Sequence, residues 1–564
     1  MIDTIRRYCK RPLDERLIPL VLLAAVGLAY GLLFNQLGLY WDDFPLTWTA
    51  HTYGLAGLAR YFSTNRPFWG LLYQLSNAVL GEQTWQWQLF ALFWRWLSAV
   101  LFWLTVRELW PRPRSAALLA GLALALYPGF GQQAIAMVYG HFFWVLSAYF
   151  LSLYAHLRAL RSARRAWAWH VLALAAVLLN LLTMEYFFLL ELARPLMLGL
   201  LRAREYQTRK AWLLRVLRDW APYLLLFLGV GIWRAFFFTY QTNNYQPLGL
   251  QSLLADPLGG LWSLIQAAGL DVLLAGLAAW GLPFTFANLD GAGLTTLALY
   301  LGVTLAVLAF SALTLFKQAG RAAEDDSAPR RAGLEMLLAG LILLVIAGGP
   351  FYLTGLPVRL HFPNDRFTIP FMPGSALLLS GLLHWAFPRR VFWRSALAAL
   401  LLGLAAGSLF ANANAYRRDW LAQRAFFWQL SWRIPGLQEG TTLLTNDLLL
   451  NFYSDNSLTA PLNWIYAPEN TSQSMPVALL YPTVRTGKDA LPAFKPGVDI
   501  SIDYLVARFN GSTDQTVAVY YQPPGCLRVL DGEVEANNLF VPAQIREAAT
   551  DLGSTEWIEA NPDN

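Results

Sequence analysis

Long apolar runs recur along the first 411 residues, and short charged connections separate them. A helix needs about 20 consecutive apolar residues to cross a bilayer, so these runs predict an all-α polytopic membrane body with about eleven transmembrane helices. The predicted spans lie near residues 17–35, 88–106, 115–131, 138–157, 167–184, 186–201, 220–240, 294–316, 333–353, 367–387 and 394–411.

Residues 241–290 are the ambiguous part of this pattern. The run Leu264–Phe284 is apolar enough to cross. One extra crossing would, however, place the basic connection Lys317–Arg331 on the outer side, against the usual bias of positive charge. We therefore expect an interfacial or re-entrant helix here. A hairpin of two crossings would preserve the same topology and stays open.

The pattern changes after residue 411. Helical periodicity continues over Asn414–Leu430, and short β-rich runs follow at Thr441–Leu444, Tyr504–Ala507 and Val517–Tyr521, bounded by Pro, Gly and Asn. The sequence thus predicts two domains. Residues 1–411 form the transmembrane body, including an outer connection at 36–87, and residues 412–564 form a small soluble α+β domain.

Composition agrees with a membrane protein. Hydrophobic residues make up 56% of the 564 and charged residues 14%, against about 25% charged in soluble domains. This excludes a soluble enzyme, a disordered chain and a nucleic-acid binder, despite the net charge of +6. Two cysteines far apart in the chain, Cys9 and Cys526, exclude a disulfide scaffold.

The charges also predict orientation. Of the 42 Lys and Arg, 25 lie in alternate connections, and the opposite connections hold Arg60, Arg66, Arg359 and Arg366. Positive connections face the cytoplasm. We therefore expect a multi-pass plasma-membrane protein with a cytoplasmic amino terminus, an uncleaved first span and an extracytoplasmic carboxyl-terminal domain. That domain is acidic, with 17 Asp and Glu against 10 Lys and Arg from Asn412 onward.

The outer connection 36–87 carries the residues best suited to chemistry. It begins Tyr40-Trp41-Asp42-Asp43-Phe44-Pro45 and continues through Arg60 to Asn65-Arg66-Pro67. Two adjacent carboxylates are costly to desolvate, and each raises the pKa of the other. A carboxylate that takes a proton and an arginine that holds a phosphate are parts that a transferase needs. The alternative is a solvated acidic pair that ends a helix.

These motifs, in this order, resemble the GT-C glycosyltransferase superfamily. The chain looks most like the protein O-mannosyltransferase branch, which includes the animal transmembrane O-mannosyltransferases with TPR repeats. The resemblance covers roughly residues 15–400 and rests on Asp42-Asp43, Arg66-Pro67, the loop Leu126–Ala134 and Thr183-Met184-Glu185, with a weaker match at Asp365-Arg366-Phe367.

The chain departs from that branch at several positions. Tyr127 stands where the family has histidine, Gln133 where it has glutamate, and Met184 where it has lysine. No TPR repeats follow the membrane body. A different acceptor, or a loss of activity, is consistent with these departures, and they put any metal or acceptor role of the Pro128 loop in doubt.

The resemblance implies an inverting transfer of sugar from a polyprenyl-phosphate donor to an acceptor hydroxyl at the outer face. It assigns the catalytic base to the acidic pair, where we favour Asp42 over Asp43 because Asp42 directly follows Trp41 at the end of the span. Asp43 would then be available to bind the acceptor or a divalent cation. No cofactor is otherwise implied. The leaving phosphate would be held by Arg66, Arg366 or a divalent cation.

Further candidates for substrate binding are the outer ionisable or aromatic residues. Glu185 lies at the outer end of its span, and its alternative role is a structural hydrogen bond at a helix break. For the three histidines, the alternative to a metal or phosphate site is a polar contact or the lining of a cavity. Glu191 and Arg194, three residues apart, are expected to pair with each other. The candidate set is Trp41, His51, His141, Glu185, His361 and Asp365.

Two other classes of function stay open. A transporter or flippase for a lipid-linked sugar explains the spans but not the acidic pair and Arg66 in one outer connection, and no internal repeat typical of transporters is present. A catalytically silent family member that binds a glycan or assembles an envelope complex is the other. The expected partners are the membrane, a lipid-linked sugar donor and a protein, lipid or polysaccharide acceptor, without nucleic acid.

Overall fold

The computed structural model describes residues 13–162, 164–203, 208–241, 247–319, 328–448, 450–481, 495–504, 506–532 and 541–559. The chain divides into two compact units. Unit 1 comprises Met1–Asn35, Trp87–Gln133 and Tyr139–Asn414, and unit 2 comprises Gln36–Gln86, Ala134–Val138 and Ala415–Asn564. The predicted boundary at 411/412 lies close to the last change of unit, whereas the outer connection groups with the carboxyl-terminal residues.

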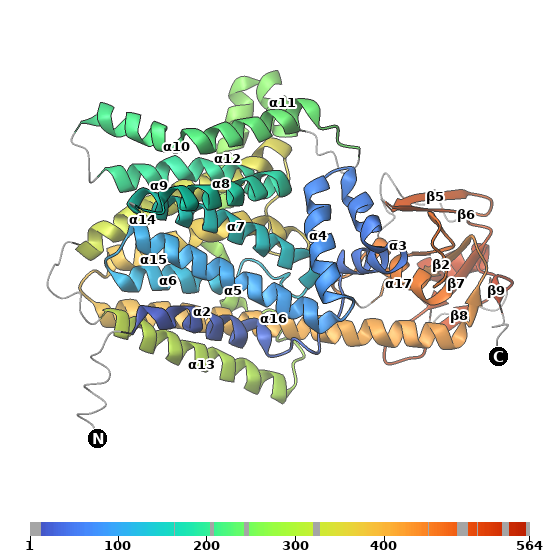
Figure 1. The fold of residues 1–564 in the computed structure, drawn as a ribbon. Coiled ribbons are helices and arrows are strands. Elements are labelled where there is room, and N and C mark those ends of the chain that lie inside the picture. Colours follow the sequence, from blue (N-terminus) through green and yellow to red (C-terminus); the bar gives the residue numbers. More distant parts are fainter. Residues whose placement is uncertain are drawn as a thin grey trace. The chain divides into compact units, whose positions relative to one another are not determined.

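Unit 1 is a bundle of apolar helices (Figure 1). Among the described residues, nine helices are long and apolar enough to cross a membrane, which makes the chain an integral membrane protein and confirms the predicted fold class. The helices that unit 1 contains, wholly or in part, are α2 (Ile18–Val26), α5 (Thr84–Leu109), α6 (Arg114–Ala125), α7 (Ala136–Arg161), α8 (Ala166–Thr183), α9 (Ala193–Arg202), α10 (Arg209–Ile232), α11 (Leu248–Ala255), α12 (Pro257–Gly276), α13 (Leu294–Ala319), α14 (Ala328–Thr354), α15 (Met372–Ala386) and α16 (Val391–Arg433).

Within the described residues, four predicted spans include π- or 3₁₀-helical stretches: 17–35, 186–201, 220–240 and 367–387. In the region 17–35, α2 gives way to a π-helical stretch at Gly27–Gly31. In the region 186–201, a 3₁₀-helix covers Glu185–Leu192 and α9 begins only at Ala193. Pro195 occupies the first turn of α9, where its missing N–H leaves no unpaired donor and its fixed φ favours a helix start. The apolar pattern alone does not reveal this break.

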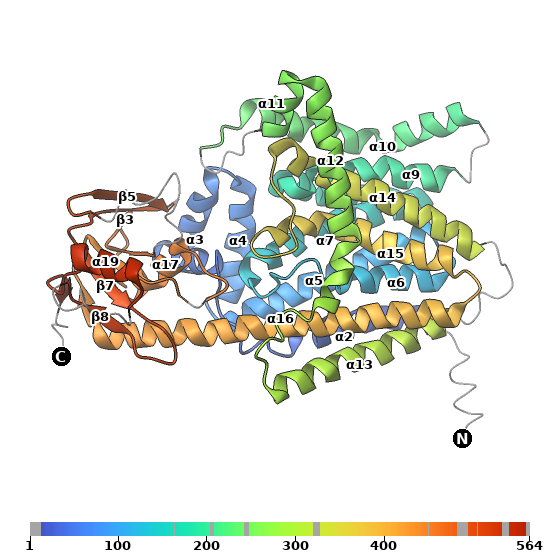
Figure 2. The same cartoon turned by 180° about the vertical axis from the view of Figure 1, so that it is seen from behind.

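The ambiguous region 241–290 contains α11 and α12. Helix α12 is long and apolar enough to be a candidate span. In Figure 2 it runs across α14 and α15 rather than alongside them, and it packs against both. The interfacial or re-entrant helix expected in this region stays a prediction.

A buried ion pair lies within the bundle. Glu191 and Arg194 are both completely buried, and Arg194 Nη2 donates to Glu191 Oε2 at 3.0 Å. Arg194 Nη2 also donates to Ser152 Oγ at 2.8 Å, and its guanidinium carbon lies 4.0 Å from the centre of the Tyr223 ring. The predicted pairing is confirmed. Removal of one partner alone would leave an uncompensated charge inside the bundle.

Unit 2 combines helices with β-sheets. Its helices are α3 (Asp43–Ser63), α4 (Pro67–Leu80), α17 (Asp455–Tyr466), α19 (Ala543–Leu552) and the end of α16. Its largest sheet has the order β4-β2-β7-β8, with β4, β2 and β7 parallel and β8 antiparallel. The strands are β1 (Gly436–Leu437), β2 (Thr441–Thr445), β3 (Ser474–Met475), β4 (Val477–Leu480), β5 (Asp499–Tyr504), β6 (Ala507–Ser512), β7 (Thr516–Tyr520), β8 (Arg528–Leu530) and β9 (Ile558–Glu559).

The three parallel strands β2, β4 and β7 are buried at every residue, because successive side chains point to opposite faces and both faces are covered. Leu444 and Ala518 pack on one side together with Phe44 and Trp48 of α3. Leu443 and Val517 pack on the other side with helices α16 and α17. The start of α3 is therefore part of the core of unit 2.

The predicted elements of the carboxyl-terminal region are found with two adjustments. The runs Thr441–Leu444 and Val517–Tyr521 correspond to β2 and β7. Tyr504–Ala507 is not a strand: Tyr504 ends β5 and Ala507 begins β6, which pair as an antiparallel hairpin. The predicted span 394–411 and the helix 414–430 form one continuous helix, α16, because no proline or glycine interrupts the sequence between them.

Candidate active site

The acidic pair lies at the first turn of α3. Asp43 is the first residue of this helix, and Asp42 occupies its N-cap position. Trp41 has a φ of 48°, a left-handed conformation that is unfavourable for a bulky residue. The preceding Tyr40 is anchored by a hydrogen bond from its hydroxyl to the carbonyl of Tyr416, at 2.9 Å. The backbone that carries the pair is thus held in a strained conformation by its surroundings.

Asp43 is buried, with 1% of its surface exposed. Its Oδ1 accepts a hydrogen bond from the N–H of Val138 at 3.0 Å, and its Oδ2 accepts one from the N–H of Met137 at 3.3 Å. Both donors belong to the first turn of α7, where N–H groups have no partner within the helix. Burial raises the pKa of Asp43 well above its usual range, while these N–H groups oppose the shift and Asp42 adds to it.

Asp42 is half-buried, and its charge and that of Arg66 both affect Tyr61 and Tyr73. Burial raises the pKa of Tyr61, the charge of Asp42 raises it further, and the charge of Arg66 lowers it. The pKa of Tyr73 is raised by burial, then by Asp43, Tyr61 and Asp42, and is lowered by Arg66. The charges of Asp42 and Arg66 therefore shift the pKa of the same two tyrosines in opposite directions. The structure brings together the acidic pair and the arginine that the sequence placed in one connection.

Arg66 stands at the N-cap of α4, directly before Pro67. Its N–H donates to the carbonyl of Phe62 at 2.8 Å, and its own carbonyl accepts from the N–H of Trp69 at 2.9 Å. The helix begins here because Pro67 is suited to the first helical position. The positive end of the α4 dipole lies at Arg66, whose side chain also carries a positive charge, and both favour an anion.

His51 also belongs to unit 2. It is exposed, its Nδ1 is 2.7 Å from Glu82 Oε1, and its ring lies 4.5 Å from that of Trp464. This ion pair and ring contact place His51 beside α17. Trp41, the remaining candidate in this unit, is half-buried.

The other predicted residues lie in unit 1, where Asp365 organises a buried network. Asp365 is 3% exposed, and its Oδ2 accepts the N–H of Gly131 at 2.7 Å. Its Oδ1 accepts from Gln132 Nε2, and Gln132 Oε1 accepts the Tyr139 hydroxyl at 2.7 Å. These contacts fix the loop after α6 to the 3₁₀-helix Asn364–Phe371. Asp365 therefore positions backbone in this structure.

The segments that carry Glu185 and Arg366 meet inside unit 1. The ring of Tyr186 lies 5.5 Å from that of Phe367. Glu185 Oε2 is 3.5 Å from Arg234 Nη1, an ion pair. The guanidinium carbon of Arg366 lies 5.1 Å from the centre of the Phe367 ring.

The two remaining histidines differ in exposure. His141, a candidate expected on the outer side of the membrane, is completely buried among the rings of Trp87, Phe90 and Trp144. Aromatic packing explains this burial, because the residues of α5 and α7 that surround the imidazole have large rings. His361 is exposed, and its carbonyl accepts the N–H groups of Asn364 and Asp365.

The residues that depart from the family motif have structural partners. The Tyr127 hydroxyl donates to the carbonyl of Ala275 at 2.8 Å, and Gln133 Oε1 accepts from Arg95 Nη1 at 3.3 Å. Within the described residues, no group of three or more His, Cys, Asp or Glu side chains is arranged to hold a metal ion. Each oxygen of Asp43 accepts one N–H group, and the divalent cation considered from the sequence stays a prediction.

Sequence reasoning did not identify Tyr61 and Tyr73 as part of this site. Both lie in the connection 36–87, and Tyr61 precedes Arg66 by five residues. Aromatic residues are frequent throughout the chain, so neither stands out from its sequence. Gln132 and Asp365 are 233 residues apart, and no local pattern predicts their contact.

Comparison with known proteins gives fold-level likeness only. No family model matches the chain, and no curated protein matches its sequence. The crystal structure of ArnT from Cupriavidus metallidurans bound to undecaprenyl phosphate is similar over 90% of this chain and 93% of that one, with 14% identity and a TM-score of 0.39. The apo structure of the same protein is similar over 89% of this chain and 92% of that one, with 14% identity and a TM-score of 0.37.

Proposed function

We propose that this protein is a membrane glycosyltransferase that moves a sugar from a polyprenyl-phosphate donor to an acceptor hydroxyl. The observation that carries the proposal is the grouping of Asp42 and Arg66 around Tyr61, beside a backbone strained at Trp41. Strained backbone persists where the surrounding structure enforces it, and it is concentrated at functional sites. The carboxylate of Asp42, at the start of α3, is suited to removing a proton. The guanidinium of Arg66, which belongs to the start of α4, is suited to binding phosphate.

The reaction is a single displacement. The Asp42 carboxylate takes the proton from the acceptor hydroxyl as that oxygen attacks the anomeric carbon of the donor sugar. A new glycosidic bond forms, the bond between the anomeric carbon and the phosphate oxygen breaks, and polyprenyl phosphate leaves with the electron pair. Attack from the side opposite the phosphate inverts the anomeric configuration.

Arg66 stabilises the charge that develops on the leaving phosphate. A guanidinium offers two parallel N–H groups to phosphate oxygens, and the start of α4 adds a favourable dipole. The resemblance assigns the same role to Arg366, and substitution of that residue tests it separately. Glu185, His51, Trp41 and His361 are proposed to bind substrate. The burial of His141 favours a packing role for that residue.

Asp43 has a different role in this proposal. Because both of its oxygens accept N–H groups of α7, it positions Asp42 rather than taking the proton itself. These hydrogen bonds join the first turn of α7 to the start of α3. They thereby fix the position of the neighbouring Asp42 carboxylate.

The test is transfer by the purified protein in lipid nanodiscs, supplied with synthetic polyprenyl-phosphate sugars. We expect donor-dependent release of polyprenyl phosphate and an inverted product, measured by mass spectrometry and NMR. Movement of intact donor across a vesicle membrane without cleavage would instead support the transporter. Donor binding without cleavage or movement would support a silent family member.

A further inference from the structure

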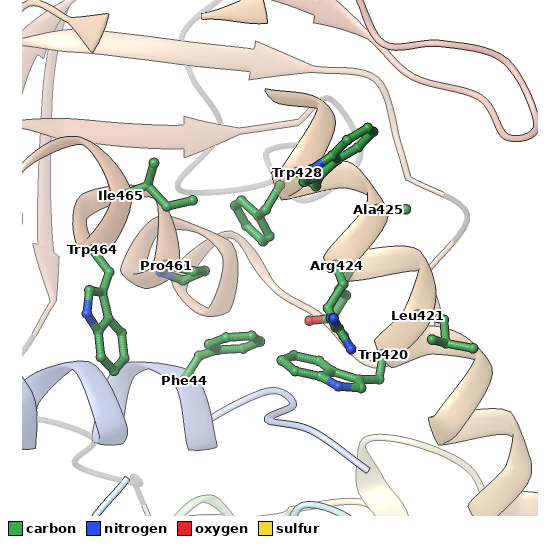
Figure 3. Close-up of a pocket in the computed structure, with 11 residues that line it drawn as sticks. Phe44, Trp420, Leu421, Arg424, Ala425, Trp428, Pro461, Trp464 and Ile465 are labelled. Atoms are coloured by element: carbon green, nitrogen blue, oxygen red, sulfur yellow. The ribbon is translucent and has the colours of Figure 1, made fainter. Parts of the chain in front are cut away.

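An open groove lies in unit 2 between the outer part of α16 and helix α17 (Figure 3). Its volume is about 610 Å³, within the range of small-molecule sites. Trp420, Arg424 and Trp428 come from α16, while Pro461 and Trp464 come from α17. Phe44 of α3 lies between the rings of Trp420 and Trp464 in the close-up.

The lining is apolar except for two residues, Gln423 and Arg424. Gln423 is 1% exposed, and its Nε2 donates to Asp419 Oδ2 at 2.8 Å. Arg424 is exposed and has no ion-pair partner in the part of the chain that the structure describes. The groove therefore presents hydrocarbon and aromatic surface with one available positive charge.

We infer that this groove binds the hydrocarbon chain of an anionic amphiphile, whose charged head pairs with Arg424, and that this amphiphile is the acceptor of the sugar. The acceptor role rests on the proposed function. The binding of an amphiphile is inferred from the shape and lining of the groove alone.

The shortage of polar groups selects the kind of occupant. A saccharide or a peptide backbone loses hydrogen bonds to water on burial and needs protein partners to replace them. Gln423 offers one oxygen, Oε1, that has no hydrogen-bond partner within the described residues, and Arg424 is one cation, so the lining cannot replace many of these bonds. A hydrocarbon chain needs none and gains from leaving water. Trp428 and Leu421, which are 63% and 50% exposed, are the surface that such a chain would cover.

The floor of the groove connects it to the acidic pair. Phe44 directly follows Asp43 in α3 and contacts Trp420, with ring centres 6.1 Å apart. A chain that lies on Phe44 is therefore held two residues from Asp42. An acceptor anchored here would bring a hydroxyl of its head group towards the proposed base.

The experiment uses the full-length protein in nanodiscs and a dodecyl phosphate with a photoactivatable diazirine on its chain. We expect cross-links to residues 420–428 and 461–465, mapped by mass spectrometry. Arg424→Gln should lower this labelling about tenfold, as expected for the loss of one charged contact. Arg433→Gln, on the same helix but outside the groove, is the matched control and should label normally. A neutral dodecyl glycoside probe should be insensitive to Arg424→Gln.

Four outcomes would overturn the inference. These are labelling outside the groove, equal labelling of both arginine variants, stronger competition by an apolar peptide than by dodecyl phosphate, and stronger competition by polyprenyl phosphate than by a saturated alkyl phosphate of equal chain length. The last would make the groove a donor site. Donor cleavage is measured in the same nanodiscs. Groove labelling without donor cleavage would overturn the proposed function and the acceptor role, whereas cleavage without groove labelling would overturn only the groove.

Discussion

Asp42 and Asp43 are neighbours with different environments. Asp43 is buried and gives both oxygens to N–H groups of α7, whereas Asp42 is half-buried and acts on Tyr61 together with Arg66. The sequence favours Asp42 as the base only weakly, because spacing does not separate adjacent residues. The hydrogen bonds of Asp43 give the preference a physical basis.

Substitution of Asp42 tests that assignment. Asp42→Asn keeps the shape but cannot take the proton, so sugar transfer should fall by about 100-fold or more, measured as initial rate of product formation. Donor binding should persist, because the phosphate contacts stay. Asp499→Asn, an exposed aspartate on β5, is the control. Parental activity in Asp42→Asn with an inactive Asp43→Asn would move the base by one residue.

Arg66 should affect donor binding. Arg66→Ala removes a charged hydrogen bond and should weaken donor affinity by about 1.5–3 kcal/mol, measured by titration of donor against protein in nanodiscs. Arg66→Lys should recover only part of the loss, because an ammonium lacks the planar fork. Arg366→Ala is expected to act in the same direction. Arg60→Ala, at an exposed arginine on α3, is the comparison, and equal affinities in all four variants would contradict the phosphate role.

At the scale of elements, Asp43 joins the start of α3 to the start of α7. Asp43→Ala leaves the N–H groups of Met137 and Val138 without this acceptor, and a buried unpaired donor costs about 1–3 kcal/mol. Peptides that cover residues 134–140 should therefore exchange amide hydrogen faster, measured by mass spectrometry. Asp43→Asn keeps one acceptor oxygen and should show a smaller effect. Unchanged exchange in both variants would show that α7 does not depend on this contact.

The same residue should make stability depend on pH. Because its folded pKa is raised, folded Asp43 holds its proton to higher pH than the unfolded chain does. Its contribution to stability is therefore complete below its ordinary pKa and is lost as pH rises through the folded value. The melting temperature of the parent should fall across this window relative to that of Asp43→Asn, which does not titrate. If the melting temperatures of the parent and of Asp43→Asn depend on pH in the same way, Asp43 does not cause the pH dependence.

At the scale of the whole molecule, the alternation of basic connections predicts that the carboxyl-terminal region lies outside the cytoplasm. Cys526 is exposed and free, and Cys9 belongs to the amino-terminal segment that is predicted to be cytoplasmic. In intact cells, a membrane-impermeant thiol reagent should label Cys526, and Cys526→Ser should abolish the signal. Cys9 should react only after lysis. The reverse pattern would invert the topology and place the acidic pair on the cytoplasmic side.

Several features of this protein follow from local sequence. Apolar runs specify membrane helices because a backbone in lipid must pair its polar groups within each helix. The buried strands β2 and β7 can also be predicted from sequence, since continuous β-branched and leucine runs are typical of strands covered on both faces. Asp42, Asp43 and Arg66 were identifiable as candidates because they interrupt a connection poor in charge.

The tertiary structure decided the features that depend on distant residues. Asp43 meets Met137 and Val138 more than 90 residues away, and Asp365 meets Gln132 at a separation of 233. The groove needs three helices from separate parts of the chain. Helical and strand periodicities report one element at a time and carry no information on which elements pack together. Chain topology and side-chain packing therefore determine which carboxylate is buried, which histidine is covered and where the aromatic groove lies.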